Sequence, residues 1–309
     1  MALRYLSARP LAPGPHDHVL LCKVKNEALR LPYFLSYYRG LGFDRFVFID
    51  NDSRDGTMEL LLAEPDCGVF HTADSFGAAY GGLPWINRLL DDYCDGRWVL
   101  AADADEILVW PGSERESIKA LTARFDASGA EALFTVMLDL YSDKPFGSIG
   151  YRQGAPFIDY LPFFDRGPYR LDKAVLFPHH QVYGGVRARL FRAMQAPIHA
   201  PTISKVPLVK WRKGQRFMLS THALKRPVEL AAMRAALLHF KLFDEILDKC
   251  RDENAIAEYF EKGREYRVLA QAIAQSRDGS FYDPRLAVRY AGTEHLTRFG
   301  IMDRENIFP

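Results

Sequence analysis

Apolar and polar positions in the first third of the chain alternate in blocks. Short apolar runs of strand length, rich in Val, Leu, Phe and Ile, occur at residues 18–24, 45–50, 68–72 and 97–103. Stretches with helix signals, such as Pro near the first turn, separate them at residues 31–42, 53–64 and 84–94. Strands that alternate with helices predict an α/β fold with a mostly parallel central sheet and helices on both faces.

The rest of the chain changes character after residue 225. Before that point, strand-like runs at residues 132–141, 185–192 and 207–211 are separated by segments rich in Gly and Pro. After it, residues 227–250 and 253–275 carry apolar side chains at helical spacing with charges between them. We therefore expect an α/β domain over residues 1–225 and a helical C-terminal extension over residues 226–309 that packs on it.

Polar residues collect where three of the expected strands end. The first strand runs into Asn26 and Glu27, the second into the segment DNDSRDGT from Asp50, and the fourth into DADE at residues 103–106. Each segment alone is weak evidence, because Asp, Asn and Gly are common turn residues. Together they favour a polar site, since ligands bind at the carboxyl ends of the strands in such sheets.

The segment VLAADADEILVW, residues 99–110, places three carboxylates between two apolar runs. Asp103 and Asp105 are two residues apart, so on extended backbone their side chains point to the same side. Mg²⁺ and Mn²⁺ prefer oxygen ligands, and one or two carboxylates often hold such an ion together with substrate phosphates. The pattern is typical of a metal–diphosphate site, but an acidic turn with a salt-bridged Asp explains it equally well at this point.

The distribution of charge adds to this picture, although the overall composition is that of an ordinary globular protein. The 309 residues carry a net charge of +1, yet residues 173–228 hold 11 Lys or Arg and no Asp or Glu. Such a stretch indicates an anionic ligand, namely a diphosphate, a nucleic acid or an acidic membrane face, or else a solvated basic face. Its few aromatic residues do not favour nucleic acid, which we do not expect as a partner.

Several signals of other protein classes are missing from the sequence. No apolar run reaches the roughly 18 residues of a spanning helix, and the N-terminus lacks the apolar core of a signal peptide. The four cysteines form no CxxC pair and are typical of reduced thiols. We expect a cytoplasmic protein, with peripheral contact to the inner face of the cell membrane left open. The chain has no GxxxxGK[ST], GxSxG, HExxH or GxGxxG motif, and Glu106 stands where a phosphatase Asp-x-Asp motif usually continues with Gly.

Two long segments carry a resemblance to a known family. They read CKVKNEALRLPYFLSYYRGLGFDRFVFIDNDSRDGT and WINRLLDDYCDGRWVLAADADEILVWP. The chain resembles family 2-type glycosyltransferases, in particular a bacterial branch with the pattern KNE…DNxSxDGT…DxDE that is linked with surface polysaccharides. The resemblance covers residues 19–112 and extends more loosely to the C-terminus. It implies a GT-A (Rossmann-like) fold, a nucleotide-sugar donor such as a UDP-sugar, and a divalent metal, Mn²⁺ or Mg²⁺.

The resemblance also implies roles in nucleotide binding for residues at matching positions. Asn26 and Glu27 would lie beside the nucleotide, and Asp50 would hold its base or ribose. Asn87, 16 residues before Asp103, matches an Asn that precedes the acidic motif in related enzymes. The candidates for the donor diphosphate are Arg187, Arg189, Lys210 and Lys241.

The implied metal site centres on the acidic motif. Asp105 would ligate the metal directly, and Asp103 would ligate it as well or contact the ribose or a metal-bound water. Glu106 is ambiguous, because it could instead face into the protein and accept hydrogen bonds from a neighbouring ligand. The expected third ligand is a histidine late in the domain, and of the two candidates we favour His239 over His222.

The general base is less well defined. If the enzyme inverts, as the resemblance implies, a carboxylate must take the proton of the acceptor hydroxyl. The carboxylates that follow the acidic motif are Asp139, Asp143, Asp159 and Asp165. We favour Asp143 and then Asp139, in the segment MLDLYSDKPFG, but the Glu-Asp pair of many family members is absent and the assignment stays open.

Three functions thus fit the sequence. The first is metal-dependent transfer of a sugar from a nucleotide sugar to a glycan or a lipid-linked acceptor. The second is a nucleotidyltransferase or phosphohydrolase that processes sugar nucleotides at the same acidic edge. The third is a non-catalytic relative that binds the nucleotide sugar without turnover.

Overall fold

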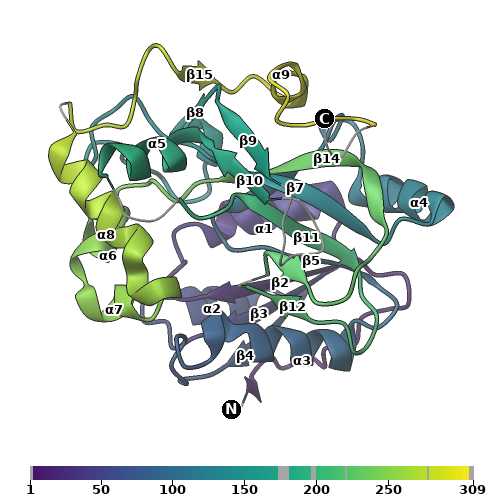
Figure 1. Cartoon of the computed structure of the whole chain (residues 1–309). Coiled ribbons are helices and arrows are strands. Elements are labelled where there is room, and N and C mark those ends of the chain that lie inside the picture. Colours follow the sequence, from purple (N-terminus) through teal and green to yellow (C-terminus); the bar gives the residue numbers. More distant parts are fainter. Residues whose placement is uncertain (1–2, 173–180, 196–199, 220, 277, 306–309) are drawn as a thin grey trace.

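The central feature of the computed structural model is a nine-stranded sheet (Figure 1). The model describes residues 3–172, 181–195, 200–219, 221–276 and 278–305. The strand order is β1-β4-β3-β2-β5-β11-β7-β14-β6. The bounds are β1 (Arg4–Tyr5), β2 (Val19–Val24), β3 (Arg45–Asp50), β4 (Cys67–His71), β5 (Trp98–Ala101), β6 (Glu106–Val109), β7 (Ala132–Asp139), β11 (Ser204–Lys210) and β14 (Leu230–His239).

Most strands of this sheet run in the same direction. The strands β2, β3, β4 and β5 pair in parallel, and so do β7 and β14. The strand β11 lies antiparallel between β5 and β7 and joins these two parallel groups, while β1 and β6 are antiparallel edge strands. The expected α/β class with a mostly parallel central sheet is confirmed.

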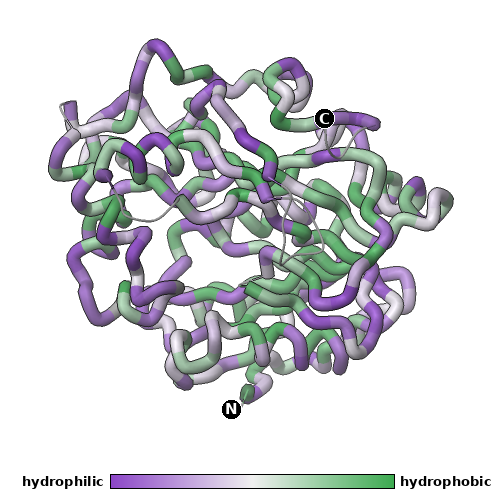
Figure 2. The backbone as a smooth tube through the Cα atoms, in the orientation of Figure 1, coloured by the Kyte–Doolittle hydropathy of each residue, from purple (hydrophilic) through white to green (hydrophobic). Residues whose placement is uncertain are grey.

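Helices cover both faces of the sheet. The connections through α1 (Leu31–Leu41) and α3 (Leu83–Tyr93) cross the sheet in opposite directions, and because parallel crossovers are right-handed they place these helices on opposite faces (Figure 1). The other α-helices in the first half of the chain are α2 (Thr57–Ala63) and α4 (Ile118–Ser128). The strands β2, β3 and β5 are buried on both faces, so they read as continuous apolar runs (Figure 2).

The helix α1 shows how local sequence sets these elements. Its buried residues Leu31, Phe34, Leu35, Tyr38 and Leu41 follow the three-to-four residue spacing of one helix face. The helix ends where Gly42 adopts a φ of 98° and its N–H binds the Arg39 and Tyr38 carbonyls. A residue with a Cβ is strained in this left-handed conformation, which is why Gly commonly ends a helix.

Two elements differ from the sequence-based expectation. Residues 185–192, expected as a strand, form the helix α5 (Gly185–Ala193), and residues 230–239, expected as a helix, form β14 inside the sheet. The segment of β14 is rich in Ala and Leu, which favour helices, but it is buried between β7 and β6, and this tertiary pairing decides its structure. The helical prediction for residues 226–239 is therefore wrong.

The expected helical part of the C-terminal segment begins after β14. The helices α6 (Ile246–Arg251), α7 (Glu253–Ala257) and α8 (Phe260–Gln275) lie side by side at one end of the sheet, and α9 (Thr293–Arg298) follows later (Figure 1). Among the described residues, no helix combines the length and the apolar character that crossing a bilayer requires.

Short two-stranded sheets and turns complete the structure. The pairs are β8 (Phe163–Asp165) with β15 (Ala287–Arg289), β9 (Tyr169–Asp172) with β10 (Gln181–Gly184), and β12 (Phe217–Met218) with β13 (Ala223–Leu224). Two 3₁₀ turns span Tyr80–Gly82 and Phe157–Asp159.

Candidate active site

The acidic motif lies on a turn between two strands that are far apart in the sheet. The strand β5 ends at Ala101 in the middle of the sheet, beside β2, whereas β6 begins at Glu106 and is the last strand of the sheet, next to β14. Two hydrogen bonds close the turn, each with a donor–acceptor distance of 3.0 Å. The Glu106 N–H donates to the Asp103 carbonyl, and the Asp103 N–H donates to Glu106 Oε2. The three carboxylates therefore sit at the carboxyl end of β5, where the sequence predicts a ligand site.

Glu106 is buried and neutralised by a lysine. Its carboxylate accepts two bonds from Lys205 Nζ on β11, at 2.6 and 2.8 Å, and the side chains of both residues are at most 2% exposed. Burial raises the pKa of Glu106, while Lys205 acts in the opposite direction. Since buried charge requires a partner, Glu106 is a structural acid that holds the turn and does not face a ligand.

Asp103 is the most open of the three acids. Its side chain is 40% exposed, and it faces Lys23 Nζ at 3.8 Å and Lys205 Nζ at 3.7 Å. Burial alone would raise the pKa of Asp103, but the two lysines outweigh it and hold the pKa below its usual value. Asp103 is thus ionised, and the two lysine ammonium groups that it faces stay 3.7 Å or more from its oxygens.

Asp105 meets His239, which the sheet register brings to the same edge. In β14, His239 lies opposite Glu106 of β6 and Asp139 of β7. His239 Nε2 is 3.4 Å from Asp105 Oδ2, and His239 Nδ1 is 2.6 Å from Asp139 Oδ1. Burial disfavours the charged imidazole, yet the two carboxylates raise the pKa of His239 to about 10. The ring is therefore protonated and fixed between them in this structure.

A chain of ion pairs continues from Asp139 into the C-terminal helices. Arg187 of α5 donates to both oxygens of Asp139, over 2.9 and 2.7 Å, and lies 3.7 Å from Glu265 of α8. Glu265 in turn accepts from Lys241 at 2.9 Å. Asp139 therefore has both oxygens committed to Arg187 and His239, a geometry that does not support it as a general base.

Three residues that the sequence suggests as contacts of the donor diphosphate, Arg187, Arg189 and Lys210, instead pair with carboxylates of the protein. The guanidinium of Arg187 is buried against Asp139, and Arg189 forms a two-bond pair with Asp165. Lys210 forms an ion pair with Asp126 and lies opposite Trp98, the first residue of β5. It is therefore at the amino end of β5, whereas the acidic motif follows the carboxyl end of that strand. The assignment of Lys210 to the diphosphate is therefore wrong.

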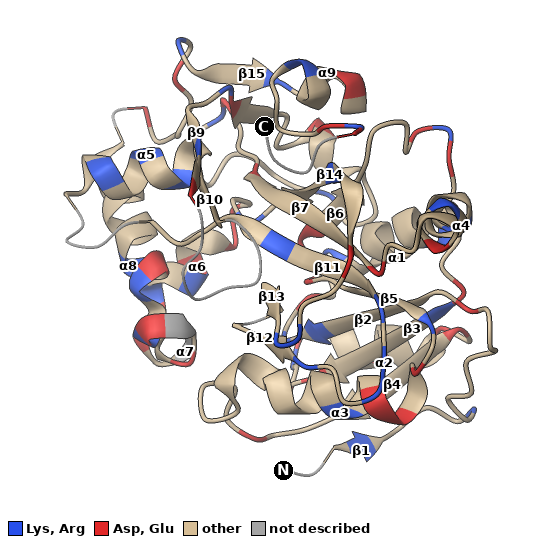
Figure 3. Ribbon diagram, turned by 45° about the vertical axis from the view of Figure 1, so that its right-hand side comes forward, with Lys and Arg blue, Asp and Glu red and all other residues tan. Residues whose placement is uncertain are grey.

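These pairs also explain the basic stretch at residues 173–228. Its members Arg187, Arg189, Lys205, Lys210 and Arg216 each bind a carboxylate from another part of the chain. The strand β11, which contains Lys205 and Lys210, carries basic colouring within the sheet in Figure 3. Lys173 lies outside the described residues. Five of the eleven basic residues of this stretch are thus paired within the fold.

The residues after β2 and β3 hold two loops together. Asn26 adopts a φ of 58°, its N–H donates to Ser53 Oγ at 2.9 Å, and its Oδ1 accepts from the Arg54 N–H at 2.8 Å. Glu27 pairs with Arg30 at 3.0 Å, and burial raises the pKa of Glu27 while Arg30 lowers it. Asn26 and Glu27 thus follow the carboxyl end of β2, at the same end of the parallel strands as the acidic motif, and their contact with a nucleotide stays a prediction.

Asp50 and Asn87 are buried. Asp50 Oδ1 accepts from the Ser53 N–H at 3.1 Å, while Oδ2 has no hydrogen-bond partner among the described residues. Both polar atoms of the Asn87 amide bind the backbone of Phe217 and thereby hold β12 against α3. The geometry gives Asn87 a structural role, whereas Asp50 has one buried carboxylate oxygen without a donor among the described residues.

His222 and the remaining carboxylates complete the comparison with the sequence. His222 Nδ1 is 2.8 Å from the Ser204 carbonyl, and burial together with the positive charge of Lys205 lowers the pKa of His222 to about 3. The histidine that meets the acidic motif directly is His239. Asp143 is exposed in the loop after β7 and Asp159 is exposed in a 3₁₀ turn, while Asp165 is buried against Arg189.

The sequence reasoning missed two lysines at the site. Lys23 and Lys205 both face Asp103, and both lie in largely buried strands of the central sheet. A lysine within a buried strand needs a carboxylate partner, and this was the available signal. Lys249 of α6 is a further cation whose charge lowers the pKa of Asp105, after the larger effect of His239 and against the effect of burial.

Comparison with known proteins does not assign this chain to a family. No family model and no curated protein matches the chain. One matching solved structure, described as a glucose-1-phosphate thymidylyltransferase from Bacillus anthracis in complex with sucrose, shares 12% identity, with 41% of this chain and 56% of that chain covered and a TM-score of 0.29. This chain therefore spans little more than half the length of that protein.

A second matching structure is a 4-diphosphocytidyl-2C-methyl-D-erythritol synthase. It shares 15% identity over 59% of this chain and 80% of that chain, with a TM-score of 0.28. Since both TM-scores are low, the function has to be argued from the residues of the site itself.

Proposed function

We propose that this protein is a metal-dependent glycosyltransferase that moves a sugar from a nucleotide sugar, a UDP-sugar in the first instance, to a glycan or lipid-linked acceptor. The observation that carries the proposal is the contact between Asp105 and His239. The two residues are 134 positions apart in the sequence and meet at the carboxyl edge of the sheet, 3.4 Å from each other. They are two of the three groups that the resemblance to family 2-type glycosyltransferases assigns to the metal.

The residues fit a divalent ion in part. Two ligands that each lie about 2.1 Å from one ion are separated by roughly 3 to 3.4 Å, which matches the Asp105–His239 distance. His239 Nδ1 is held by Asp139, an arrangement that orients metal-binding histidines and leaves Nε2 for the ion. Within the described residues, however, no three His, Cys, Asp or Glu side chains converge as they stand. Asp103, which is open, would have to turn toward this pair.

The proposed chemistry follows from these positions. Asp105, His239 and Asp103 would hold the ion, which when bound neutralises the diphosphate and assists its departure. His239 would give up its Nε2 proton on binding, and Asp139 would keep the ring in place. The buried Oδ2 of Asp50 has no donor among the described residues, and this supports the placement of the nucleotide base or ribose near β3. Asp143, exposed in the loop after β7, stays our candidate for the base.

Thermal unfolding with UDP and Mn²⁺ tests the proposal. A ligand present at about 100 times its Kd stabilises the folded state by roughly 2.7 kcal/mol, so UDP with Mn²⁺ should raise the melting temperature and UDP without metal should raise it less. Asp105→Asn should abolish the metal-dependent part. Asp248→Asn, at an exposed carboxylate of α6, is the matched control and should behave as wild type.

Other nucleotides and reactions complete this test. GDP, CMP and dTDP, measured in the same way, identify the nucleotide class. Hydrolysis of a UDP-sugar in Mn²⁺ without acceptor would support sugar transfer. Turnover of a nucleoside triphosphate without sugar transfer would contradict the proposal and favour a nucleotidyltransferase, and nucleotide binding without any turnover would favour a non-catalytic relative.

A further inference from the structure

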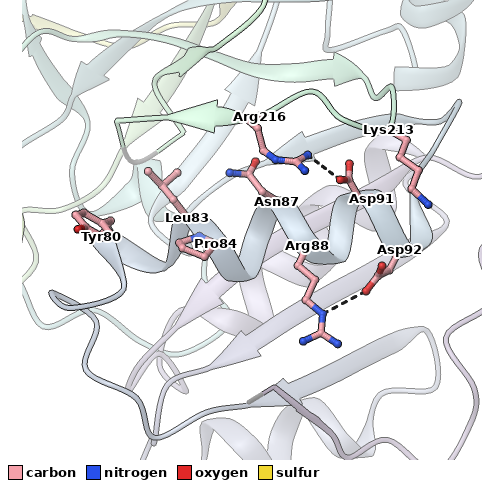
Figure 4. Close-up of a pocket in the computed structure, with 9 residues that line it drawn as sticks. All are labelled: Tyr80, Leu83, Pro84, Asn87, Arg88, Asp91, Asp92, Lys213 and Arg216. Atoms are coloured by element: carbon pink, nitrogen blue, oxygen red, sulfur yellow. Dashed lines mark hydrogen bonds and ion pairs between the residues drawn. The ribbon is translucent and has the colours of Figure 1, made fainter. Parts of the chain in front are cut away.

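A groove with a volume of about 610 Å³ runs along α3 (Figure 4). Tyr80 lies at the end of the groove where α3 begins, and Lys213 lies toward the end where α3 finishes. Leu83 and Pro84 supply an apolar wall, and Arg216 reaches in from the opposite side. The proposed donor site described above uses none of these side chains.

Tyr80 is presented to solvent on a rigid turn. Its side chain is 76% exposed, more than that of any other large apolar residue described. Its φ is 50°, and Gly81 and Gly82 follow with φ values of 71° and 76°. Lys23 Nζ donates to the Gly81 carbonyl at 3.1 Å. A non-glycine residue in left-handed conformation costs about 1 kcal/mol or more, and such strain gathers at ligand-binding sites.

The packing around Gly82 fixes this turn. A Cβ at Gly82 would lie 2.8 Å from the Trp85 ring and 3.0 Å from Lys23 Cδ, so the backbone is in direct contact with both side chains. The Tyr80 backbone is therefore held from beneath while its ring stays free. An exposed aromatic ring on a fixed backbone can stack on a ligand with little loss of conformational entropy.

The polar side of the groove is also preorganised. The Asp91 carboxylate accepts bonds from Trp211 Nε1, the Gly214 N–H and Arg216 Nη1, at 3.0, 3.0 and 2.7 Å. This fixes the Arg216 guanidinium, and Arg216 lines the groove. Arg88 and Asp92 form a second, exposed pair at 3.4 Å (Figure 4). The ammonium of Lys213 makes no ion pair with any residue that the structure describes.

We propose that this groove binds a saccharide chain of the acceptor, and that the chain is acidic. An aromatic face combined with fixed, planar hydrogen-bonding groups suits a sugar ring, which has an apolar C–H face and a rim of hydroxyl groups. The groove holds three cations and two carboxylates, and Asp91 is already satisfied by three donors. Lys213, whose ammonium has no ion-pair partner in the part of the chain that the structure describes, therefore favours a sugar that carries a carboxylate or phosphate group.

The location of the groove links it to the proposed reaction, on which this inference rests. Lys23 binds the turn that carries Tyr80 and faces Asp103 across 3.8 Å. The Tyr80 end of the groove thus borders the acidic motif, and the Lys213 end points away from it. A chain in the groove would have the sugar at Tyr80 nearest to the donor and its remaining sugars along α3.

Titration calorimetry without any donor nucleotide tests the proposal. The probes are a panel of neutral, uronic-acid-containing and phosphate-bearing oligosaccharides of matched length. We expect acidic members to bind, and Tyr80→Ala to weaken them by about tenfold, the equivalent of one aromatic contact. Lys213→Ala should weaken the acidic members and leave any neutral ones unchanged. Tyr282→Ala, at another exposed tyrosine outside the groove, is the control and should bind as wild type.

Three outcomes would overturn the proposal. The first is that no member of the panel binds the wild-type protein. The second is that Tyr80→Ala binds the panel as tightly as wild type. The third is that Tyr80→Ala weakens UDP binding while saccharide binding stays intact, which would assign the Tyr80 ring to the nucleotide base. Stabilisation by UDP and Mn²⁺ is measured on the same variants. If that stabilisation is present but saccharide binding is absent, only the groove is wrong; if saccharides bind but UDP does not, the proposed donor site is wrong.

Discussion

The buried pair of Lys205 and Glu106 offers the sharpest test of how the acidic turn is held. Lys205→Met removes the ammonium while keeping a chain of similar length, and leaves the Glu106 carboxylate buried without its counter-ion. Removing one partner of a buried ion pair typically costs about 3–5 kcal/mol, because the remaining charge is desolvated and has no counter-ion. We expect Lys205→Met to lose this much free energy of unfolding in urea at pH 8.

The pH dependence of the same variant gives an independent check. Burial already raises the pKa of Glu106. Without Lys205, the smaller electrostatic effect of His239 is what still lowers this pKa. The folded state of the variant then binds a proton that the unfolded state releases near pH 4.3, so its stability falls as the pH rises above that value. The loss relative to wild type should be small at pH 4.5 and large at pH 8.

The double variant Lys205→Met, Glu106→Gln separates the pair from its surroundings. Glutamine keeps an oxygen that can accept from the Asp103 N–H, so the turn can still close. The double variant should recover most of the stability lost by Lys205→Met, with a coupling energy of about 2–3 kcal/mol. A loss below about 1 kcal/mol for Lys205→Met at pH 8, or the same loss at pH 4.5, would refute this account of a buried pair.

Three further predictions concern other parts of the structure. Lys210→Ala should leave UDP affinity unchanged in titrations with Mn²⁺, because Lys210 lies at the amino end of β5, away from the acidic motif; a tenfold loss would contradict its placement. Burial lowers the pKa of His222 to about 3, so its contribution to stability is complete above pH 6.5 and falls as the pH drops toward 3; His222→Gln should flatten urea stability across that range. Gly82→Ala should destabilise by about 2 kcal/mol or more, since its Cβ would meet Trp85, whereas Gly56→Ala, with φ 92° but open space around it, should lose only about 1 kcal/mol; equal losses would contradict the close packing.

The sequence predicts the first half of the fold well because its elements carry strong local signals. The strands β2 and β3 are apolar runs bounded by charged residues, and α1 has Pro near its start and Gly42 after its end. Such signals act within a few residues and do not depend on the rest of the chain. The same reasoning located Asp103 and Asp105 at a strand end, where the structure has them.

The sequence alone could not show which charged residues form ion pairs with each other. Glu106 and Lys205 are 99 residues apart, and Arg187 and Asp139 are 48 apart. Each looks like an available charge when taken alone, so Arg187 was assigned to the diphosphate and Asp139 to proton transfer. Only the pairing of strands and helices shows that these charges neutralise one another, and this leaves Asp103 as the open carboxylate of the motif.

The misassigned strand β14 and the candidate site are connected. A helix over residues 230–239 would follow the sheet as a separate layer, and nothing would align His239 with a particular residue of the acidic turn. As a strand, β14 is parallel to β7 and antiparallel to β6, which places His239 opposite both Asp139 and Glu106. The Phe240 N–H then donates to the Asp105 carbonyl at 2.7 Å and fixes the turn against the end of the strand. The contact between His239 and Asp105, on which the proposed function depends, is therefore a consequence of the same strand pairing that overrides the helical preference of this Ala- and Leu-rich segment.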